Sequence, residues 1–267
     1  MFAAALTWEK LVGIGSAVAV ENAVRYTLFA GLGWLLGYVW FRQRWAKRKI
    51  VPAYPARTDV WREVRLSLTT VIFYGLVGAA TVWAALQGWT QLYWKPAAHG
   101  WGWFAASIGL TILVHDTYFY WTHRLMHHPR LFRWFHRGHH LSTNPSPWAA
   151  YAFDPLEAIV QAGIFPVAVA LYPIHPLAFA TFMVWQLTFN IFGHAGYEFW
   201  PRWLMDSWLG KVMNTPTAHI LHHQHLRGHY GLYFNWWDRL LGTNLDHYEA
   251  CFREVTSPER HAPHPSH

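Results

Sequence analysis

The chain contains a run of 40 residues without a formal charge, AIVQAGIFPVAVALYPIHPLAFATFMVWQLTFNIFGHAGY (residues 158–197). A helix needs roughly 20 apolar residues to cross the hydrocarbon core of a bilayer. Pro173 and Pro176 interrupt the run near its middle, so we expect a tight helical hairpin in the membrane. The first arm is short and contains Pro166, which favours a re-entrant helix or one that begins before residue 158.

Three further apolar stretches precede this run, at residues 26–41, 66–86 and 101–121, and Asp116 is the only charged residue within them. Charged residues make up only 13% of the 267-residue chain, whereas hydrophobic residues make up 53%. So few charges cannot cover that many apolar helices with a soluble surface. We therefore predict an all-α fold, an integral-membrane helical bundle of about four to five spans with a histidine-rich cytoplasmic helical cap.

The basic residues indicate how the bundle is oriented. Eight of the 21 Lys and Arg residues lie in residues 42–65, between two apolar stretches. Residues 122–150 carry four and the segment from residue 198 carries six, whereas residues 88–100 contain only Lys95. The positive-inside rule places the three basic segments in the cytoplasm. The net charge of +7 is thus interpreted as an orientation signal and not as a nucleic-acid site. We expect no cleaved secretory signal peptide, because no basic segment precedes a short apolar stretch at the N-terminus.

Histidine is the unusual residue of this chain, since its 19 copies outnumber the 14 Asp and Glu residues. Most of these histidines lie at the predicted cytoplasmic ends of the spans, in the patterns H-R-L-M-H, H-R-G-H-H and H-I-L-H-H. Residues three and four apart share one face of a helix, so each pattern presents several imidazoles together. Imidazole suits iron, zinc, copper and nickel. The patterns contain too many histidines for one ion, and therefore predict two metals.

Several metal chemistries are excluded by what the sequence lacks. The single cysteine, Cys251, rules out a thiolate cluster, and no H-E-x-x-H zinc-protease motif occurs. Di-iron bundles of the soluble type need Glu ligands, and few carboxylates lie near the patterns. A redox metal pair held by neutral imidazoles fits best. A membrane zinc hydrolase and a metal-binding or transport protein stay open as alternatives, although ligands at span ends disfavour transport.

Five motifs together resemble the fatty acid hydroxylase and sterol desaturase superfamily of integral-membrane oxygenases, over about residues 108 to 243. They are DTYFYWTHRLMHH (residues 116–128), FHRGHH (135–140), DPLE (154–157), AHILHH (218–223) and YGLYFNWWDRLLGT (230–243). The resemblance implies a di-iron centre, O2 as co-substrate, an external ferredoxin- or cytochrome-type electron donor and a lipid substrate from the bilayer. It thus implies an O2-dependent hydroxylase or desaturase that acts on an unactivated C–H bond of a membrane lipid.

The resemblance also assigns the expected metal ligands and divides the chain. The ligands are His123, His127, His136, His139, His140, His219, His222 and His223, with His194 as an additional one. Carboxylates near metal-bound histidines orient the rings, and the expected ones are Asp116, Asp154, Glu157 and Asp238. Contributions from His115, His128, His225 and His229 stay open. We expect N-terminal spans and a basic loop over residues 1–100, a catalytic domain over 101–250 and a disordered tail over 251–267.

Overall fold

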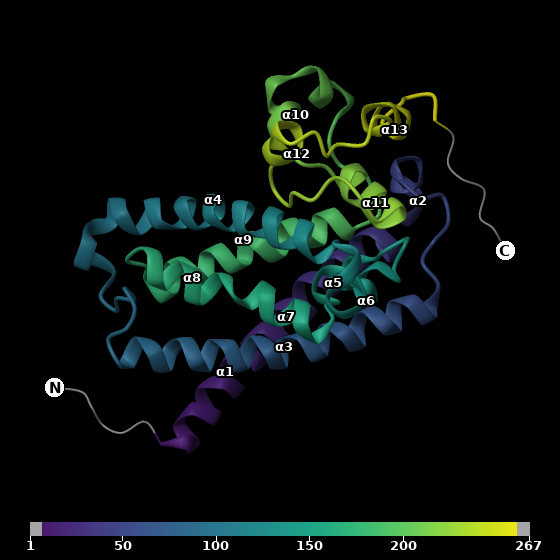
Figure 1. Ribbon diagram of the computed structural model, residues 1–267. Helices are drawn as coiled ribbons and strands as arrows, with labels where there is room; N and C mark the ends of the chain where they lie inside the picture. Colours follow the sequence, from purple (N-terminus) through teal and green to yellow (C-terminus); the bar gives the residue numbers. More distant parts are fainter. Residues whose placement is uncertain (1–6, 261–267) are drawn as a thin grey trace.

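The computed structural model describes residues 7–260. All regular secondary structure in this part of the chain is helical, and it contains no strand (Figure 1). The predicted all-α class is confirmed. Only isolated bridges, such as the one between Lys49 and Tyr197, connect extended segments. The α-helices are α1 (Trp8–Trp34), α2 (Arg42–Trp45), α3 (Arg57–Leu86), α4 (Gly100–Met126), α5 (Pro129–Phe135), α6 (Arg137–His140), α7 (Pro155–Ala162), α8 (Ile164–Leu171), α9 (Pro176–His194), α10 (Trp208–Val212), α11 (Pro216–His225), α12 (Trp236–Leu240) and α13 (Tyr248–Val255).

Within residues 7–260, three helices are long and apolar enough to cross a membrane, namely α3, α9, and α4 together with the turn that begins at Pro96. Figure 1 shows these helices running the length of the bundle, with α5, α6 and α11 gathered at one end and α10, α12 and α13 above them in this view. The short helices form a cap, because Pro129 and Pro216 begin new helices at that end.

The uncharged run forms the predicted hairpin. Its first arm begins before residue 158, which is one of the two predicted alternatives, and it is bent. This arm starts at Pro155, runs to Leu171, and is divided at Gly163 between α7 and α8. Pro166 lies in the first turn of α8, where a missing N–H interrupts no helical hydrogen bond. The Tyr118 hydroxyl donates to Val160 O (2.6 Å) beside the bend and occupies the space of a Gly163 side chain.

The first helix is longer than the apolar stretch at residues 26–41 predicts. α1 begins at Trp8 and continues as a π-helical turn through Trp40. Its Glu21 and Arg25 are an i,i+4 ion pair, so these charges do not end the helix. α1 crosses α3 where Gly15 and Gly75 meet, and a Cβ on Gly75 would lie 2.5 Å from Gly15 O.

Residues 146–153 attach the N-terminal helices to the rest of the molecule. The carbonyl of Trp148 accepts hydrogen bonds from the Tyr26 hydroxyl on α1 (2.8 Å) and from the Ser67 hydroxyl on α3 (3.0 Å). The Tyr151 ring stacks on Tyr26 with 5.6 Å between ring centroids. These contacts cross the predicted division at residue 100, so both sides share one core.

The start of the predicted disordered tail at residue 251 is wrong. α13 runs through it to Val255, because Tyr248 and Phe252 are buried against Leu204, Met205 and α11. Residues 261–267 lie outside the described part of the chain.

Candidate metal centre

Nine histidines form two compact groups at the cap end of the bundle. Within each group one ring nitrogen from every residue lies within 4.8 Å of those of the others. The nine are the expected ligands, but their division into five and four follows only from the fold. The first group is His123, His127, His136, His140 and His222, and the second is His139, His194, His219 and His223.

Adjacent residues of one motif serve different groups. His139 and His140 lie next to each other in α6, and His222 and His223 in α11, yet each pair is split between the two groups. Successive residues of a helix point about 100° apart, so both groups draw on the same two helices. The ends of α4 and α9 supply most of the remaining histidines. The groups therefore lie side by side and share α6 and α11.

The ring nitrogens within each group face one another at contact distance. In the first group, His123 Nε2 lies 2.9 Å from His136 Nε2, and His127 Nε2 lies 3.1 Å from the Nε2 atoms of both His140 and His222. In the second, His194 Nε2 lies 2.9 Å from His219 Nε2, 3.2 Å from His223 Nε2 and 3.3 Å from His139 Nε2.

The opposite ring nitrogens show where the protons are. In five of the nine residues Nδ1 donates to a backbone carbonyl, which can only accept, and a neutral ring then has a lone pair at Nε2. These hydrogen bonds join His123 to Tyr230 O (2.9 Å), His139 to Ala152 O (3.2 Å), His194 to Asn190 O (2.7 Å), His222 to Gly228 O (2.6 Å) and His223 to Ser142 O (2.9 Å). The second group thus has three neighbouring lone pairs with no proton between them, an arrangement that a cation would stabilise.

Burial keeps the imidazoles neutral. Eight of the nine histidines are buried, and His127 is partly buried. Desolvation, reinforced by the neighbouring rings, lowers the pKa of His139, His222 and His223 well below the usual histidine value. The same causes lower the pKa of His136, His140 and His219. These rings are therefore neutral at pH 7, the state in which histidine binds metal.

Of the four expected carboxylates, Glu157 contacts a histidine of the groups directly. It is fully buried, and its Oε1 lies 2.7 Å from His136 Nδ1. Asp154 instead accepts the Gly138 N–H (2.6 Å) and so holds α6 between the two groups.

Asp116 and Asp238 hold the loop that follows α11. Asp238 accepts the N–H groups of Tyr230 (2.9 Å) and Gly231 (2.8 Å), and the Tyr230 carbonyl is the acceptor for His123. Asp116 accepts the N–H groups of Tyr233 (2.9 Å) and Phe234 (3.1 Å). Both carboxylates thus act on the groups through backbone, and an orienting role for all four remains a prediction.

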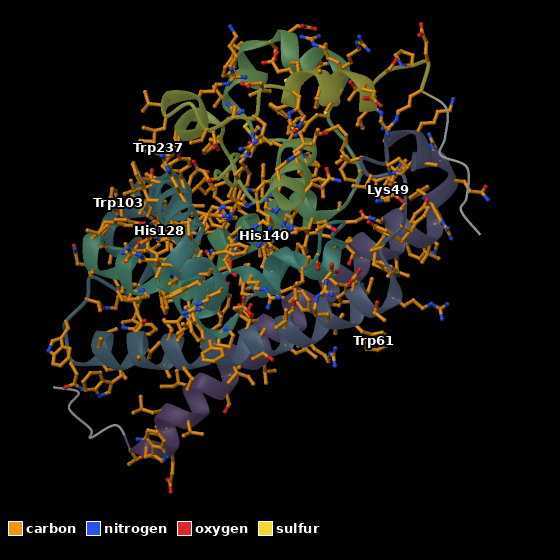
Figure 2. All side chains as sticks on the ribbon, turned by 45° about the vertical axis from the view of Figure 1, so that its right-hand side comes forward. Lys49, Trp61, Trp103, His128, His140 and Trp237 are labelled. Carbon is orange, nitrogen blue, oxygen red and sulfur yellow. The ribbon has the colours of Figure 1, made fainter. Side chains whose placement is uncertain are left out.

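The four histidines left open by the sequence lie outside both groups. His115 is buried in the bundle, where its Nδ1 lies 2.8 Å from the Tyr233 hydroxyl. His128, labelled in Figure 2 with the buried His140, is exposed and accepts the Arg130 N–H at the start of α5. The His225 ring packs against His247 on the surface. His229 is buried, has a positive φ of 52°, and accepts the Leu245 N–H (3.2 Å).

Glu198 is a structural residue of the site that the sequence analysis missed. Its side chain is fully buried, and Oε2 accepts both the N–H (3.0 Å) and the hydroxyl (2.7 Å) of Thr217 in the first turn of α11. Glu198 thereby ties the segment after His194 to the helix that carries His219. Its position in the sequence could have indicated this role, since Glu198 is the first charged residue after the uncharged run.

The fold and the histidine groups together define a class of protein. Its members are helical, have helices that could cross a membrane, and carry a site of histidines that could hold two metal ions. Residues 108–243, just over half of the chain, match the family model described as fatty acid hydroxylase. The chain therefore belongs to the fatty acid hydroxylase family, which confirms the predicted resemblance and its extent.

Curated relatives support the same membership. The chain is 32% identical over 202 residues to a Delta(7)-sterol 5(6)-desaturase of Aspergillus fumigatus, covering 70% of this chain and 63% of the relative. It is 30% identical over 188 residues to one of Gibberella zeae, covering 70% and 57%. It is 24% identical over 230 residues to human lathosterol oxidase, covering 85% and 74%. The chain thus spans about 60% of the length of the two fungal relatives. No solved structure matches it.

Proposed function

We propose that this chain is an O2-dependent oxidoreductase, a hydroxylase or desaturase that acts on an unactivated C–H bond of a membrane lipid. The observation that carries the proposal is the convergence of neutral, buried imidazoles in two adjacent groups. Family membership supports an oxidoreductase, and the names of the relatives point to lipids of the sterol type. We extend that chemistry to this chain as a proposal.

The residues present fit a pair of iron ions. The first ion would be held among His123, His127, His136, His140 and His222, and the second among His139, His194, His219 and His223. When bound, the iron pair supplies the redox chemistry that activates O2 and oxidises the C–H bond. Imidazole also suits zinc, so the choice of iron rests on the family.

The chain's own residues hold and shield this site. Carbonyl acceptors such as Gly228 O and Asn190 O fix the rings with Nε2 directed inward. Glu157 lies beside His136, and in its carboxylate form it would offset part of the positive charge of bound ions. Burial of the rings excludes water.

The electron donor and the orientation in the membrane belong to the same proposal. Basic residues surround the short helices of the site, among them Arg124, Arg130, Arg133 and Arg137. An acidic ferredoxin- or cytochrome-type protein would be attracted to such a surface. We place this end in the cytoplasm, where the Lys and Arg excess belongs, and the lipid in the bilayer beside the long helices. We also keep residues 101–250 as the catalytic part and residues 1–100 as its membrane support.

The test combines metal content with lipid analysis on detergent-purified protein prepared without oxygen. We expect about two irons per chain, together with an O2-dependent lipid product after a donor system is added. A product with one added oxygen atom identifies a hydroxylase, and one lacking two hydrogen atoms identifies a desaturase. Two zinc ions, with no O2-linked product even after iron reconstitution with a donor, would contradict the proposal and favour a zinc hydrolase.

A further inference from the structure

The loop that follows α11 leaves the cap and lies along the long helices. The ring of Tyr233, which is fully buried, packs against Phe189 on α9 with 5.5 Å between centroids, and against Trp185 with 6.0 Å. Trp185 is the middle residue of α9 and lies nine residues before His194 at the cap end. Nine residues of helix correspond to about 14 Å along the axis. The loop therefore reaches from the metal centre toward the middle of the spans.

α12 is fixed beside α4 at a similar depth (Figure 1). The Trp237 indole N–H donates to the Thr117 hydroxyl (3.2 Å), and the Trp237 ring packs against Trp121 with 5.8 Å between centroids. The apolar stretch of α4, residues 101–121, is about 30 Å long, which matches the hydrocarbon core of a bilayer. Thr117 lies one turn inside the end of that stretch. α12 is therefore held at membrane depth, although it is too short to cross a membrane.

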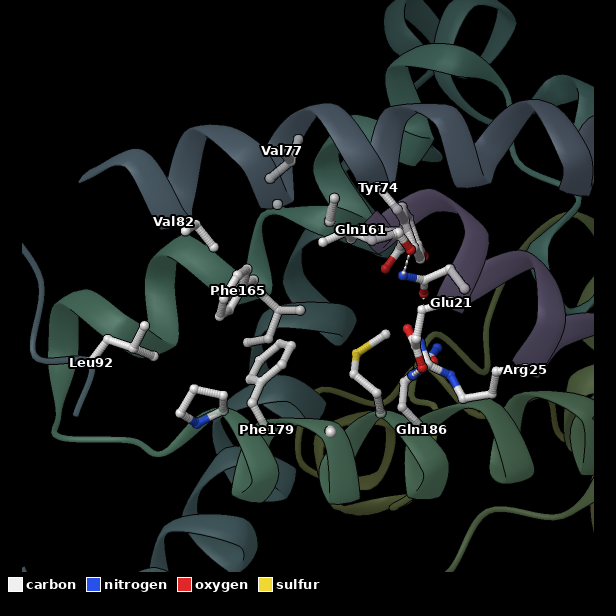
Figure 3. A pocket seen from close by; sticks show the side chains of 18 of the residues that line it. Glu21, Arg25, Tyr74, Val77, Val82, Leu92, Gln161, Phe165, Phe179 and Gln186 are labelled. Carbon is white, nitrogen blue, oxygen red and sulfur yellow. Dashed lines mark hydrogen bonds and ion pairs between the residues drawn. The ribbon is translucent and has the colours of Figure 1, made fainter. Parts of the chain in front are cut away.

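The side of α4 that carries α12 is the outer one. Leu113, Thr117 and Trp121 are spaced four residues apart and therefore share one face, on which Leu113 and Trp121 are exposed. The opposite side of α4 faces the bundle interior, where His115 lines a cavity of about 340 Å³ between α1, α3, α8 and α9 (Figure 3). α12 thus covers part of the face that a span presents to lipid, and Leu113 continues that face one turn further along.

The part of α12 that is turned away from the protein is apolar. Leu240 is 73% exposed, and Trp236, four residues earlier on the same face, is also exposed, as is the following Leu241. The one basic residue of the helix, Arg239, instead pairs with Glu249 on α13 (3.6 Å). The charge of α12 is thus directed to the cap, and its apolar side is left uncovered at membrane depth.

The loop before α12 has its backbone satisfied by protein groups. Irregular backbone at membrane depth needs such partners, because no water is present there. Asp116 Oδ1 accepts the N–H groups of Tyr233 (2.9 Å) and Phe234 (3.1 Å), and the Val212 carbonyl accepts the Asn235 N–H (2.6 Å). Asp116 is the only charged residue of the apolar stretch 101–121. Its place in a span is explained by this use.

We propose that residues 230–241 form a re-entrant segment, held by Asp116, that enters the membrane from the side of the metal centre and contacts the lipid chains of that leaflet through Leu240 and Leu241. The segment adds a lipid contact to those of the spanning helices. It also connects this contact to the metal centre, because the Tyr230 carbonyl at its start accepts the His123 Nδ1–H (2.9 Å). The inference goes beyond the proposed function and depends on the membrane placement of α4 and α9 alone.

Labelling of single cysteines with a water-soluble maleimide tests the contact with lipid. In a Cys251→Ser background, cysteine replaces Leu240, Leu113 as the membrane reference, or the exposed Leu226 of the cap as the water reference. The full chain is reconstituted in dioleoylphosphatidylcholine vesicles with at most one chain in each. We expect Leu240→Cys to react at least about tenfold more slowly than Leu226→Cys, because a thiol in apolar surroundings forms little of the reactive thiolate. A rate equal to that of Leu226→Cys would overturn the inference, and one close to that of Leu113→Cys supports it.

Variants of Asp116 test how the segment is held. Asp116→Leu removes the acceptor of two backbone N–H groups, so labelling of Leu240→Cys should rise toward the rate of Leu226→Cys. Asp116→Asn is the matched control and should keep labelling slow, since its amide oxygen can replace Oδ1, and Oδ2 has no hydrogen-bond partner in the described chain. The thermal midpoint checks that each variant is folded.

Two further outcomes would overturn the inference. One is slow labelling of Leu240→Cys in a folded Asp116→Leu variant. The other is slow labelling that appears only when many chains share a vesicle, which would identify a second copy of the chain as the partner. Neither test needs metal or turnover, so failure of the inference leaves the proposed function untouched, and absence of lipid oxidation leaves the inference untouched.

Discussion

The metal-centre end of the molecule is buried, the crossing of α1 with α3 is only partly buried, and the two regions are stabilised differently. At the metal-centre end, imidazoles, carboxylates and backbone carbonyls are fixed by directional hydrogen bonds, such as those of Glu198 to Thr217. At the crossing, the glycines Gly15 and Gly75 allow two apolar helices to approach closely. We therefore expect changes in the first region to act on metal binding, and changes at the crossing to act on stability alone. Each change below tests that separation by its effect on metal binding.

The largest effect on metal is expected from His222→Ala. His222 faces His127 in the first group, and its loss leaves a gap among the buried lone pairs. We expect the variant to lose at least one ion per chain and all lipid oxidation, and His139→Ala to do the same at the second group. Elemental analysis of purified protein provides the measurement. The exposed His128→Ala is the matched control, and normal metal content in His222→Ala would contradict the ligand assignment.

Acid should destabilise the metal-free protein strongly. Six histidines of the groups, including His136 and His219, have a lowered pKa in the folded chain. As the pH falls below about 6.5, the unfolded chain binds protons at these residues and the folded chain does not, so stability falls. Each such histidine contributes up to about 1.4 kcal/mol per pH unit. Buried carboxyls such as Glu198, whose pKa is raised by burial to about 7, oppose part of this loss because the folded chain protonates them first.

Thermal midpoints of metal-depleted protein between pH 8 and pH 5 provide the measurement. They should be level above pH 7 and fall steeply below pH 6. Metal-loaded protein should resist acid better, because bound ions compete with protons. A midpoint that rises on acidification would contradict the neutral state of the rings.

A smaller loss of metal affinity is expected from Glu157→Gln. Glu157 Oε1 lies 2.7 Å from His136 Nδ1, and the substitution replaces the carboxyl group beside this ring with an amide. Changes of this kind typically cost about 10–100-fold in metal affinity. Competition with a metal chelator measures the loss. The exposed Glu249→Gln is the control, and unchanged affinity in Glu157→Gln would limit its role to packing.

The smallest effect on metal is expected from Gly75→Val. The added side chain would collide with Gly15 O, and overpacking of this kind destabilises by about 1–3 kcal/mol. The thermal midpoint should fall, while the folded fraction keeps the metal content of the parent. Gly13→Val, which has open space around it, should change neither. A specific loss of metal in Gly75→Val would show that the two regions are coupled.

Much of this architecture follows from the sequence because its strongest signals are periodic. The four-residue spacings His123 to His127, His136 to His140 and His219 to His223 bring each pair into one group, and the long uncharged run forms a hairpin. The separation into five and four could not be predicted, since it depends on how α6 and α11 face each other. The sequence alone did not reveal that α1 begins well before residue 26, because Glu21 and Arg25 neutralise each other only when the helix has formed. Glu198 was missed because its partner lies 19 residues away.

The docking of residues 146–153 on α1 and α3 also has a consequence for how the protein is made. Chains emerge from the ribosome N-terminus first, so Tyr26 and Ser67 are synthesised before the Trp148 carbonyl that they bind. The ligands on α11 follow later still, and both groups need that helix. Neither histidine group is therefore complete until α11 has been made, so the proposed metal pair can load only late in the biosynthesis of the chain.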